Sequence, residues 1–220
     1  MGQSPTVFAL IFSEVRVLKL VVGLGNPGPE YVWSRHNAGW LILDSYVSRL
    51  GLREPRMQFG GAFWPASILE GERVAWLKPH TYMNLSGRSV VEAVRYFDVE
   101  PEDLFVVFDD VALPFGKLRY RESGSAGGQK GMISILGMMD TLDVPRLRVG
   151  VGAPTPQIDI KDWVLGKFLK EQRDAWPKVE NLAWGALMKW LRGDAGPGFT
   201  LQLESEKPEK NSNGKNDGRG

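Results

Sequence analysis

The chain has 220 residues, of which 43% are hydrophobic, so it is long enough for one packed domain with short tails. It contains no cysteine, which excludes a disulfide framework, thiolate catalysis and any zinc site with Cys ligands. Its formal net charge of +1 neither favours nor excludes a polyanionic partner, which would need a local basic patch. No segment of the sequence is long and apolar enough to predict a membrane span.

Short apolar runs alternate with amphipathic stretches along the chain. In order, the first half predicts a strand at Leu18–Gly23, a helix at 37–50 that stops at Gly51, a hairpin formed by 61–70 and 73–78, and a helix at 84–97 capped by Asn84 or Ser86. The second half predicts strands at 104–108 and Lys117–Arg121, a helix at 128–142, a strand at 147–152 and a helix at 171–191 around Pro177.

Strands that alternate with helices predict an α/β fold, and the hairpin makes the sheet mixed rather than wholly parallel. We expect a single-domain three-layer sandwich in which a twisted mixed β-sheet is flanked by helices. We assign residues 1–16 to an N-terminal extension and residues 17–203 to the domain. Residues 204–220 are predicted to be a disordered tail, because they lack apolar periodicity and are rich in Lys, Glu, Asn, Gly and Asp.

His36 is the leading candidate for a catalytic residue. It is one of two histidines in the chain, and histidine exchanges a proton near neutral pH more readily than other side chains. Asn26, Asn37, Asn84 and Asp109 each follow a predicted strand or begin a loop, and ligands collect at strand ends in an open α/β sheet. A histidine among amides suits general-base hydrolysis, with Asp109 orienting the imidazole. The alternative for Asp109 is a turn-forming or helix-capping role.

The glycines before His36 suggest a different ligand that we consider and disfavour. Gly23–Gly28 formally match the G-x-G-x-x-G signature of dinucleotide-binding proteins and follow a predicted strand. That mechanism needs a helix N-terminus directly after the glycines. Here Pro27 and Pro29 remove two backbone amides, and the next helix is predicted to begin only near Asn37. The acidic residue expected at the end of a second strand is also missing.

A set of basic residues could bind phosphate. Its members, which share one predicted strand or are candidates to extend its basic face, are Lys117, Arg119, Arg121, Lys130, Arg146 and Arg148. The first three alternate along the strand, so their side chains align on one face. The loop 124–131 (GSAGGQKG) precedes a helix and suits close approach to a phosphate or a backbone. A basic face that is merely solvated remains the alternative.

Several segments together resemble one enzyme family. They read GLGNPGPEY with SRHNAGW, KPHTYMNLSG, VVFDDVALPFGKLR, GSAGGQKGM and RLRVGVG. In this order and spacing they closely resemble the bacterial peptidyl-tRNA hydrolase family, over about residues 18–191. The resemblance implies hydrolysis of the ester between a peptide and the 3′ ribose of tRNA, which recycles tRNA from peptidyl-tRNA released during translation. It also implies a cytoplasmic monomer that needs no metal or cofactor and has no membrane partner.

The resemblance assigns roles to individual residues. It implies that His36 is catalytic, that Asp109 supports it, and that Asn26 and Asn84 are the site asparagines. The residues that it places against the substrate, where they would line the cleft for the peptide and the 3′ end or clamp a terminal phosphate of the acceptor stem, are Tyr31, Met83, Arg121 and Arg148.

The chain also departs from the family pattern. Where the family usually reads Gly-Gly-His-Asn-Gly, this chain has Gln129 and Lys130 at the third and fourth positions. We expect both to contact the substrate, Gln129 by hydrogen bonding and Lys130 through a phosphate. Ala112 replaces an acidic residue that is common in the family. The alternative function is that of a non-catalytic RNA-binding relative, similar to the splicing factors that share the fold. Retention of His36 and Asp109 favours the enzyme.

Overall fold

The computed structural model describes residues 18–204, and within them one mixed sheet is formed in the order β2-β3-β4-β1-β5-β7-β6-β8. Its strands are β1 (Leu18–Gly23), β2 (Arg56–Gln58), β3 (Gly61–Leu69), β4 (Glu72–Pro79), β5 (Leu104–Asp110), β6 (Lys117–Arg121), β7 (Arg146–Gly150) and β8 (Gly198–Gln202). The predicted N-terminal extension and all but the first residue of the predicted tail lie outside the described residues.

The centre of the sheet is parallel and its two edges are antiparallel. Strand β1 pairs in parallel with β4 and β5, and β5 pairs in parallel with β7. At one edge β2, β3 and β4 pair antiparallel in that order, and at the other edge β6 lies antiparallel to β7 and β8. Because β1, β4, β5 and β7 run in the same direction, their carboxyl ends meet along one side of the molecule.

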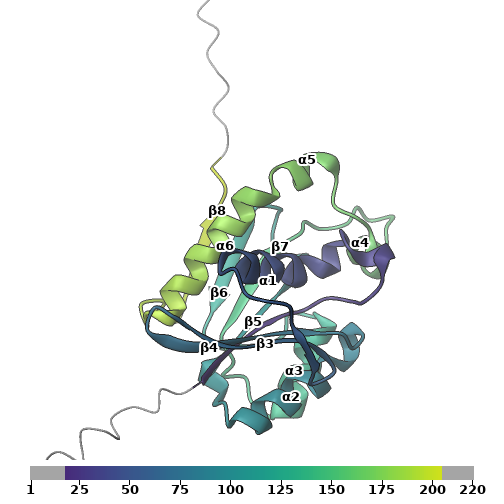
Figure 1. The fold of residues 1–220 in the computed structure, drawn as a ribbon. Helices are drawn as coiled ribbons and strands as arrows, with labels where there is room; N and C mark the ends of the chain where they lie inside the picture. The colour runs from purple at the N-terminus through teal and green to yellow at the C-terminus, as the bar shows by residue number, and fades with distance from the viewer. Residues whose placement is uncertain (1–17, 205–220) are drawn as a thin grey trace, which may run out of the picture.

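Helices cover both faces of the sheet, as Figure 1 shows. They are α1 (Ala38–Arg49), α2 (Ser86–Phe97), α3 (Lys130–Met139), α4 (Ile160–Leu165), α5 (Lys170–Asp174) and α6 (Trp176–Leu191). One hydrophobic cluster joins α1 and α6 to the sheet, and a second joins α2 and α3 to the opposite face. The predicted three-layer α/β sandwich with a mixed sheet is therefore confirmed.

Several local predictions need correction. The helix predicted at 84–97 begins only at Ser86, after the 3₁₀ turn Met83–Leu85, and neither Asn84 nor Ser86 caps it: Ser86 Oγ instead donates to the carbonyl of Met83. The helix predicted at 128–142 is α3, which is shorter and ends where Asp140 adopts a left-handed conformation with φ 53°. The helix predicted at 171–191 is divided into α5 and α6, with Pro177 in the first turn of α6, where proline costs no hydrogen bond.

A glycine lets α1 approach the sheet closely enough to position the turn before it. A Cβ atom on Gly39 would lie 2.2 Å from the carbonyl oxygen of Val107 and 2.6 Å from the backbone nitrogen of Leu24. Only glycine fits there without moving the backbone. The backbone of Leu24 also donates to Val107 at 2.9 Å and accepts from Trp40 at 3.1 Å. The start of α1 is thereby held against the carboxyl ends of β1 and β5.

Among residues 18–204, no helix has the length and apolar character needed to cross a membrane.

Candidate active site

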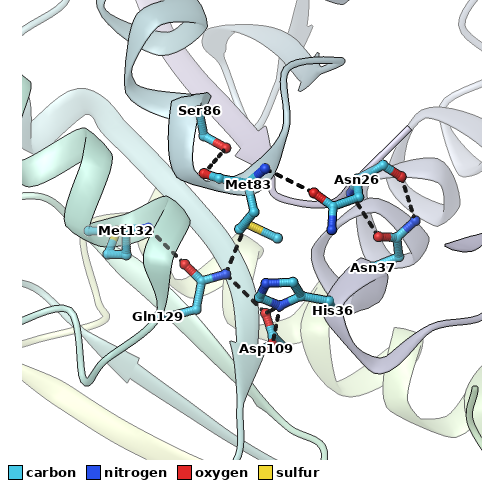
Figure 2. A network of polar contacts seen from close by, with 8 residues as sticks. All are labelled: Asn26, His36, Asn37, Met83, Ser86, Asp109, Gln129 and Met132. Carbon is cyan, nitrogen blue, oxygen red and sulfur yellow. Dashed lines mark hydrogen bonds and ion pairs between the residues drawn. The ribbon is translucent and has the colours of Figure 1, made fainter. Parts of the chain in front are cut away.

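A buried histidine and aspartate form the centre of the candidate site. The 3₁₀ turn Arg35–Asn37, directly before α1, places His36 over the end of β5. Its Nδ1 lies 2.8 Å from Oδ1 and 2.9 Å from Oδ2 of Asp109 (Figure 2). Both residues are buried, with 8% and 3% of their surfaces exposed. Strand β5 is two residues longer than predicted. Asp109 therefore lies within the strand, opposite Val149 of β7, rather than after its end.

This contact determines what the imidazole can do. An ionised carboxylate only accepts hydrogen bonds, so Nδ1 of His36 must be the donor. In the neutral ring, Nε2 then carries the lone pair and no proton. Figure 2 shows this second nitrogen pointing away from Asp109, and His36 lines the cleft described below. The arrangement is that of a general base oriented by a carboxylate.

Asn26 is held in one orientation beside this pair. Its side-chain Oδ1 accepts a hydrogen bond of 2.9 Å from the backbone nitrogen of Met83, so its Nδ2 remains as a donor. The backbone of Asn26 is held in turn by Asn37, whose Oδ1 accepts from its N–H at 2.8 Å and whose Nδ2 donates to its carbonyl at 3.1 Å. The amide donor of Asn26 is therefore fixed before any ligand binds.

A cleft of about 640 Å³ opens over these residues. Of the residues predicted for the site, those that line it are Asn26, Tyr31, His36, Met83, Asn84, Asp109, Gln129, Lys130 and Arg148. Arg121 does not line it. The short helix α4 adds Ile160, Val164 and Leu165 to the lining of the cleft, and the sequence analysis did not predict this helix. Their helical spacing was the available signal, but six residues are too few to produce a clear amphipathic pattern.

Four of the predicted basic residues lie on neighbouring strands, β6 and β7. In the register of β6 and β7, Arg119 lies opposite Arg148 and Arg121 opposite Arg146, so all four belong to one face of the sheet. Arg148 Nε lies 2.8 Å from Oδ2 of the buried Asp110, which orients the guanidinium at the cleft. The predicted alignment of Arg119 and Arg121 on one strand face is confirmed.

Arg146 does not extend the basic surface, contrary to the prediction. Its side chain is buried and donates to the carbonyls of Leu142, Val144 and Gly124. Burial lowers its pKa to about 10, so the guanidinium still carries its charge at neutral pH. It acts as a brace between the glycine-rich loop and the turn before β7.

The second histidine lies outside the cleft. His80 packs on Trp40 with ring centroids 5.3 Å apart, and Lys78 lies over the same Trp40 ring. Partial burial, with a smaller contribution from Lys78, lowers the pKa of His80. His36 is therefore the one histidine that lines this cleft. Within residues 18–204, no group of three or more His, Asp or Glu side chains is arranged to hold a metal ion.

The same chain is similar to known proteins of one family. Residues 20–209 match the model of the peptidyl-tRNA hydrolase family. A peptidyl-tRNA hydrolase of Symbiobacterium thermophilum is 48% identical over 154 residues, which cover 68% of this chain and 80% of that protein. One from Citrifermentans bemidjiense is 43% identical over 174 residues, which cover 79% of this chain and 92% of that protein. The crystal structure of peptidyl-tRNA hydrolase from Acinetobacter baumannii matches with a TM-score of 0.74 and 30% sequence identity. The match covers 80% of this chain and 89% of that one. The chain belongs to the peptidyl-tRNA hydrolase family.

Proposed function

We propose that this chain hydrolyses the ester bond between a peptide and the 3′ ribose of tRNA, with His36 as the general base. The observation that carries the proposal is the contact of His36 Nδ1 with Asp109 at 2.8 Å, which leaves Nε2 unprotonated in a cleft. An ester is cleaved by an activated water, and a neutral imidazole with a free Nε2 can accept a proton from that water.

The chemistry follows from the geometry of the pair. Nε2 of His36 removes a proton from water, and the resulting oxygen nucleophile attacks the ester carbonyl. The tetrahedral intermediate then expels the 3′ oxygen, which takes the proton back from the imidazolium. The products are a peptide carboxylic acid and a free ribose hydroxyl. Asp109 remains ionised and stabilises the imidazolium while it exists.

Polar side chains around the pair would stabilise and position the ester. The fixed Nδ2 of Asn26 is a donor for the carbonyl oxygen as negative charge develops on it. Asn84, which lies at the rim of the cleft, is a second candidate donor. We assign Tyr31 and Met83, which line the same cleft, to contacts with the peptide and the 3′ end. All of these residues come from one chain, so a monomer contains the complete site.

The acceptor stem would lie along the basic side of the cleft. Arg148 faces the cleft from β7, and Arg119 and Arg121 continue the same face of the sheet on β6. The side chains of Arg119 and Arg121 are partly exposed, and the alternate residues of β6, Leu118 and Tyr120, pack in the hydrophobic cluster with α1 and α6 on the opposite face. We propose that Arg121 and Arg148 contact phosphates near the 3′ end.

The phosphate role of these two arginines predicts a change in salt dependence. Replacing Arg121 and Arg148 together by glutamine should weaken tRNA binding and lower the slope of log affinity against log salt by roughly one per lost contact. Equilibrium binding of tRNA at several salt concentrations measures the slope. Hydrolysis of short N-acyl esters without an acceptor stem is the control and should be unaffected. An unchanged slope for tRNA would mean that the strand is only a solvated basic face.

Lys130 should contribute to affinity rather than to turnover. It is the first residue of α3, is exposed, and lines the cleft, so its ammonium can approach a phosphate near the free amides of that helix end. Lys130→Asn should raise KM for peptidyl-tRNA at low salt and leave kcat within a few-fold, because His36 and Asp109 are untouched. Lys170→Asn is a matched control, because Lys170 is likewise an exposed first residue of a helix, α5, but does not line the cleft. Equal KM values for wild type and Lys130→Asn would show that Lys130 has no phosphate contact.

One assay distinguishes hydrolysis from RNA binding alone. The purified chain is incubated with tRNA carrying an N-acetylated amino acid, and release of the acetylated amino acid is followed without added metal. Release that rises with enzyme concentration supports the proposed reaction. Tight tRNA binding without release would instead favour the non-catalytic relative.

A further inference from the structure

The amide of Gln129 has three contacts inside the site. Its Oε1 accepts a hydrogen bond of 2.7 Å from the backbone nitrogen of Met132, and its Nε2 lies 3.0 Å from Oδ1 of Asp109. The same Nε2 lies 3.1 Å from the sulfur of Met83. Gln129 is buried, with 8% of its surface exposed, and Figure 2 shows it on the opposite side of Asp109 from His36.

The orientation of this amide is determined by the backbone. The N–H of Met132 can only donate, so the amide oxygen of Gln129 must face it. The NH₂ group is then forced toward Asp109 and Met83. Both of its hydrogens have acceptors within the protein, which leaves no donor of Gln129 for the substrate.

The same logic continues to the imidazole. Gln129 donates a hydrogen bond to Oδ1 of Asp109, so the carboxylate acts as an acceptor on that side. Its carboxylate also accepts from Nδ1 of His36 at both oxygens. The N–H of Met132 thus fixes the orientation of the Gln129 amide, and the amide makes Asp109 a hydrogen-bond acceptor. Asp109 in turn holds the proton of the neutral imidazole on Nδ1 of His36, which leaves Nε2 unprotonated in the cleft.

We infer that Gln129 is a positioning residue for the hydrolysis, because its amide holds the Asp109 carboxylate as the acceptor of the His36 Nδ1 proton. This inference rests on the proposed function and gives Gln129 a role different from the substrate contact expected from its sequence position. Gln129 does not touch the reacting atoms. It acts through Asp109 on the protonation of His36.

Other charged groups face the pair and set the background for any pH measurement. Those that line the cleft or flank the pair are Asp110, which is paired with Arg148, and Tyr31, Tyr82, Lys130, Asp159, Lys161 and Arg35. Gln129→Met leaves the charges of all these groups unchanged, so its pH profile is the neutral reference for that of Gln129→Glu.

Gln129→Glu separates the two roles of this side chain. A carboxylate keeps an acceptor for the N–H of Met132, so the cap of α3 survives, but it places a second negative charge beside Asp109. We expect the acid limb of the kcat–pH profile to move upward by about one pH unit, with kcat recovering at high pH. A profile that coincides with that of wild type would overturn the inference and reduce Gln129 to a helix cap.

Gln129→Met removes the hydrogen bonds while keeping a similar length. We expect kcat to fall roughly tenfold, the effect of losing one hydrogen bond to a charged group, with KM unchanged. The control is Gln172→Met, because Gln172 also accepts a backbone N–H at a helix start but is only partly buried and does not line the cleft. A raised KM with unchanged kcat would instead indicate that Gln129 contacts the substrate, which would overturn the inference. Equal effects of the two substitutions would show that Gln129 has only a structural role.

Imidazole NMR gives a readout that does not depend on turnover. The chain has two histidines, so ¹⁵N spectra contain two rings, with His80 as the internal reference. In wild type we expect the neutral His36 ring to carry its proton on Nδ1, and in Gln129→Met a measurable share of the Nε2–H form. An unchanged tautomer in the variant would overturn the inference. An inactive wild type with the expected tautomer would instead count against the proposed function alone.

Discussion

Replacing His36 by alanine should reduce kcat by about 10²–10⁴-fold, the usual contribution of general-base catalysis. No other histidine lines the cleft within the described residues, so no other imidazole is placed to accept the proton of water. Asp109 would keep its hydrogen bond from Gln129, which limits the cost of removing its partner. Folding and tRNA binding should therefore persist. Release of an N-acetylated amino acid from tRNA measures kcat, and filter binding measures affinity.

His80→Ala is the matched control for this experiment. It removes the other histidine, which packs on Trp40 outside the cleft, and should leave kcat near the wild-type value. Thermal unfolding of both variants shows whether either loss is structural. If His36→Ala retained more than a tenth of wild-type turnover, His36 would not be the base.

The pattern of apolar residues predicted the centre of this fold well. The central strands β1 and β5 are continuous buried runs, and such runs leave a strong signal because both faces of the sheet are covered. The edge strand β2 was missed because its three residues are largely exposed. Strand β8 was missed for a related reason: it is only partly buried and depends on pairing with β6, which lies far away in sequence.

The part of the candidate site that lies at the carboxyl ends of the parallel strands was predictable from the sequence. His36 and Asp109 are 73 residues apart, yet the rule that ligands collect at the carboxyl ends of parallel strands brings them together. The burial of Arg146 was not predictable, because it depends on carbonyls of the 124–125 loop and of the turn before β7. The direction of the Gln129 amide was equally hidden, since one backbone N–H on α3 decides it.

Asp109→Asn should lower kcat by about 10²–10⁴-fold while leaving KM nearly unchanged. The new amide must present its oxygen to the donor of Gln129, because that position held the acceptor Oδ1. Its nitrogen then replaces Oδ2, 2.9 Å from Nδ1 of His36, and only its oxygen, 2.8 Å away at the position of Oδ1, can still accept from Nδ1. Replacing one of the two acceptors beside Nδ1 by a donor raises the share of the ring form with its proton on Nε2, and this form cannot accept a proton from water. Steady-state kinetics on N-acetyl-aminoacyl-tRNA measure the loss, and imidazole NMR identifies the tautomer.

The double variant Asp109→Asn with Gln129→Glu should be at least about tenfold faster than Asp109→Asn alone, although Gln129→Glu by itself is slower than wild type near neutral pH. An ionised glutamate offers an oxygen where Gln129 offered a donor, so the amide at position 109 turns its nitrogen toward that oxygen. Its own oxygen then occupies the position of Oδ2, 2.9 Å from Nδ1 of His36, while a hydrogen of the amide is held by the carboxylate at position 129. The ring form with its proton on Nδ1 is thereby favoured again, and Nε2 is free of a proton. The double variant also carries the same net charge as wild type, which removes a general electrostatic explanation. If the two single effects simply multiplied, the residues would act independently, and Gln129 would have no part in setting the proton position on His36.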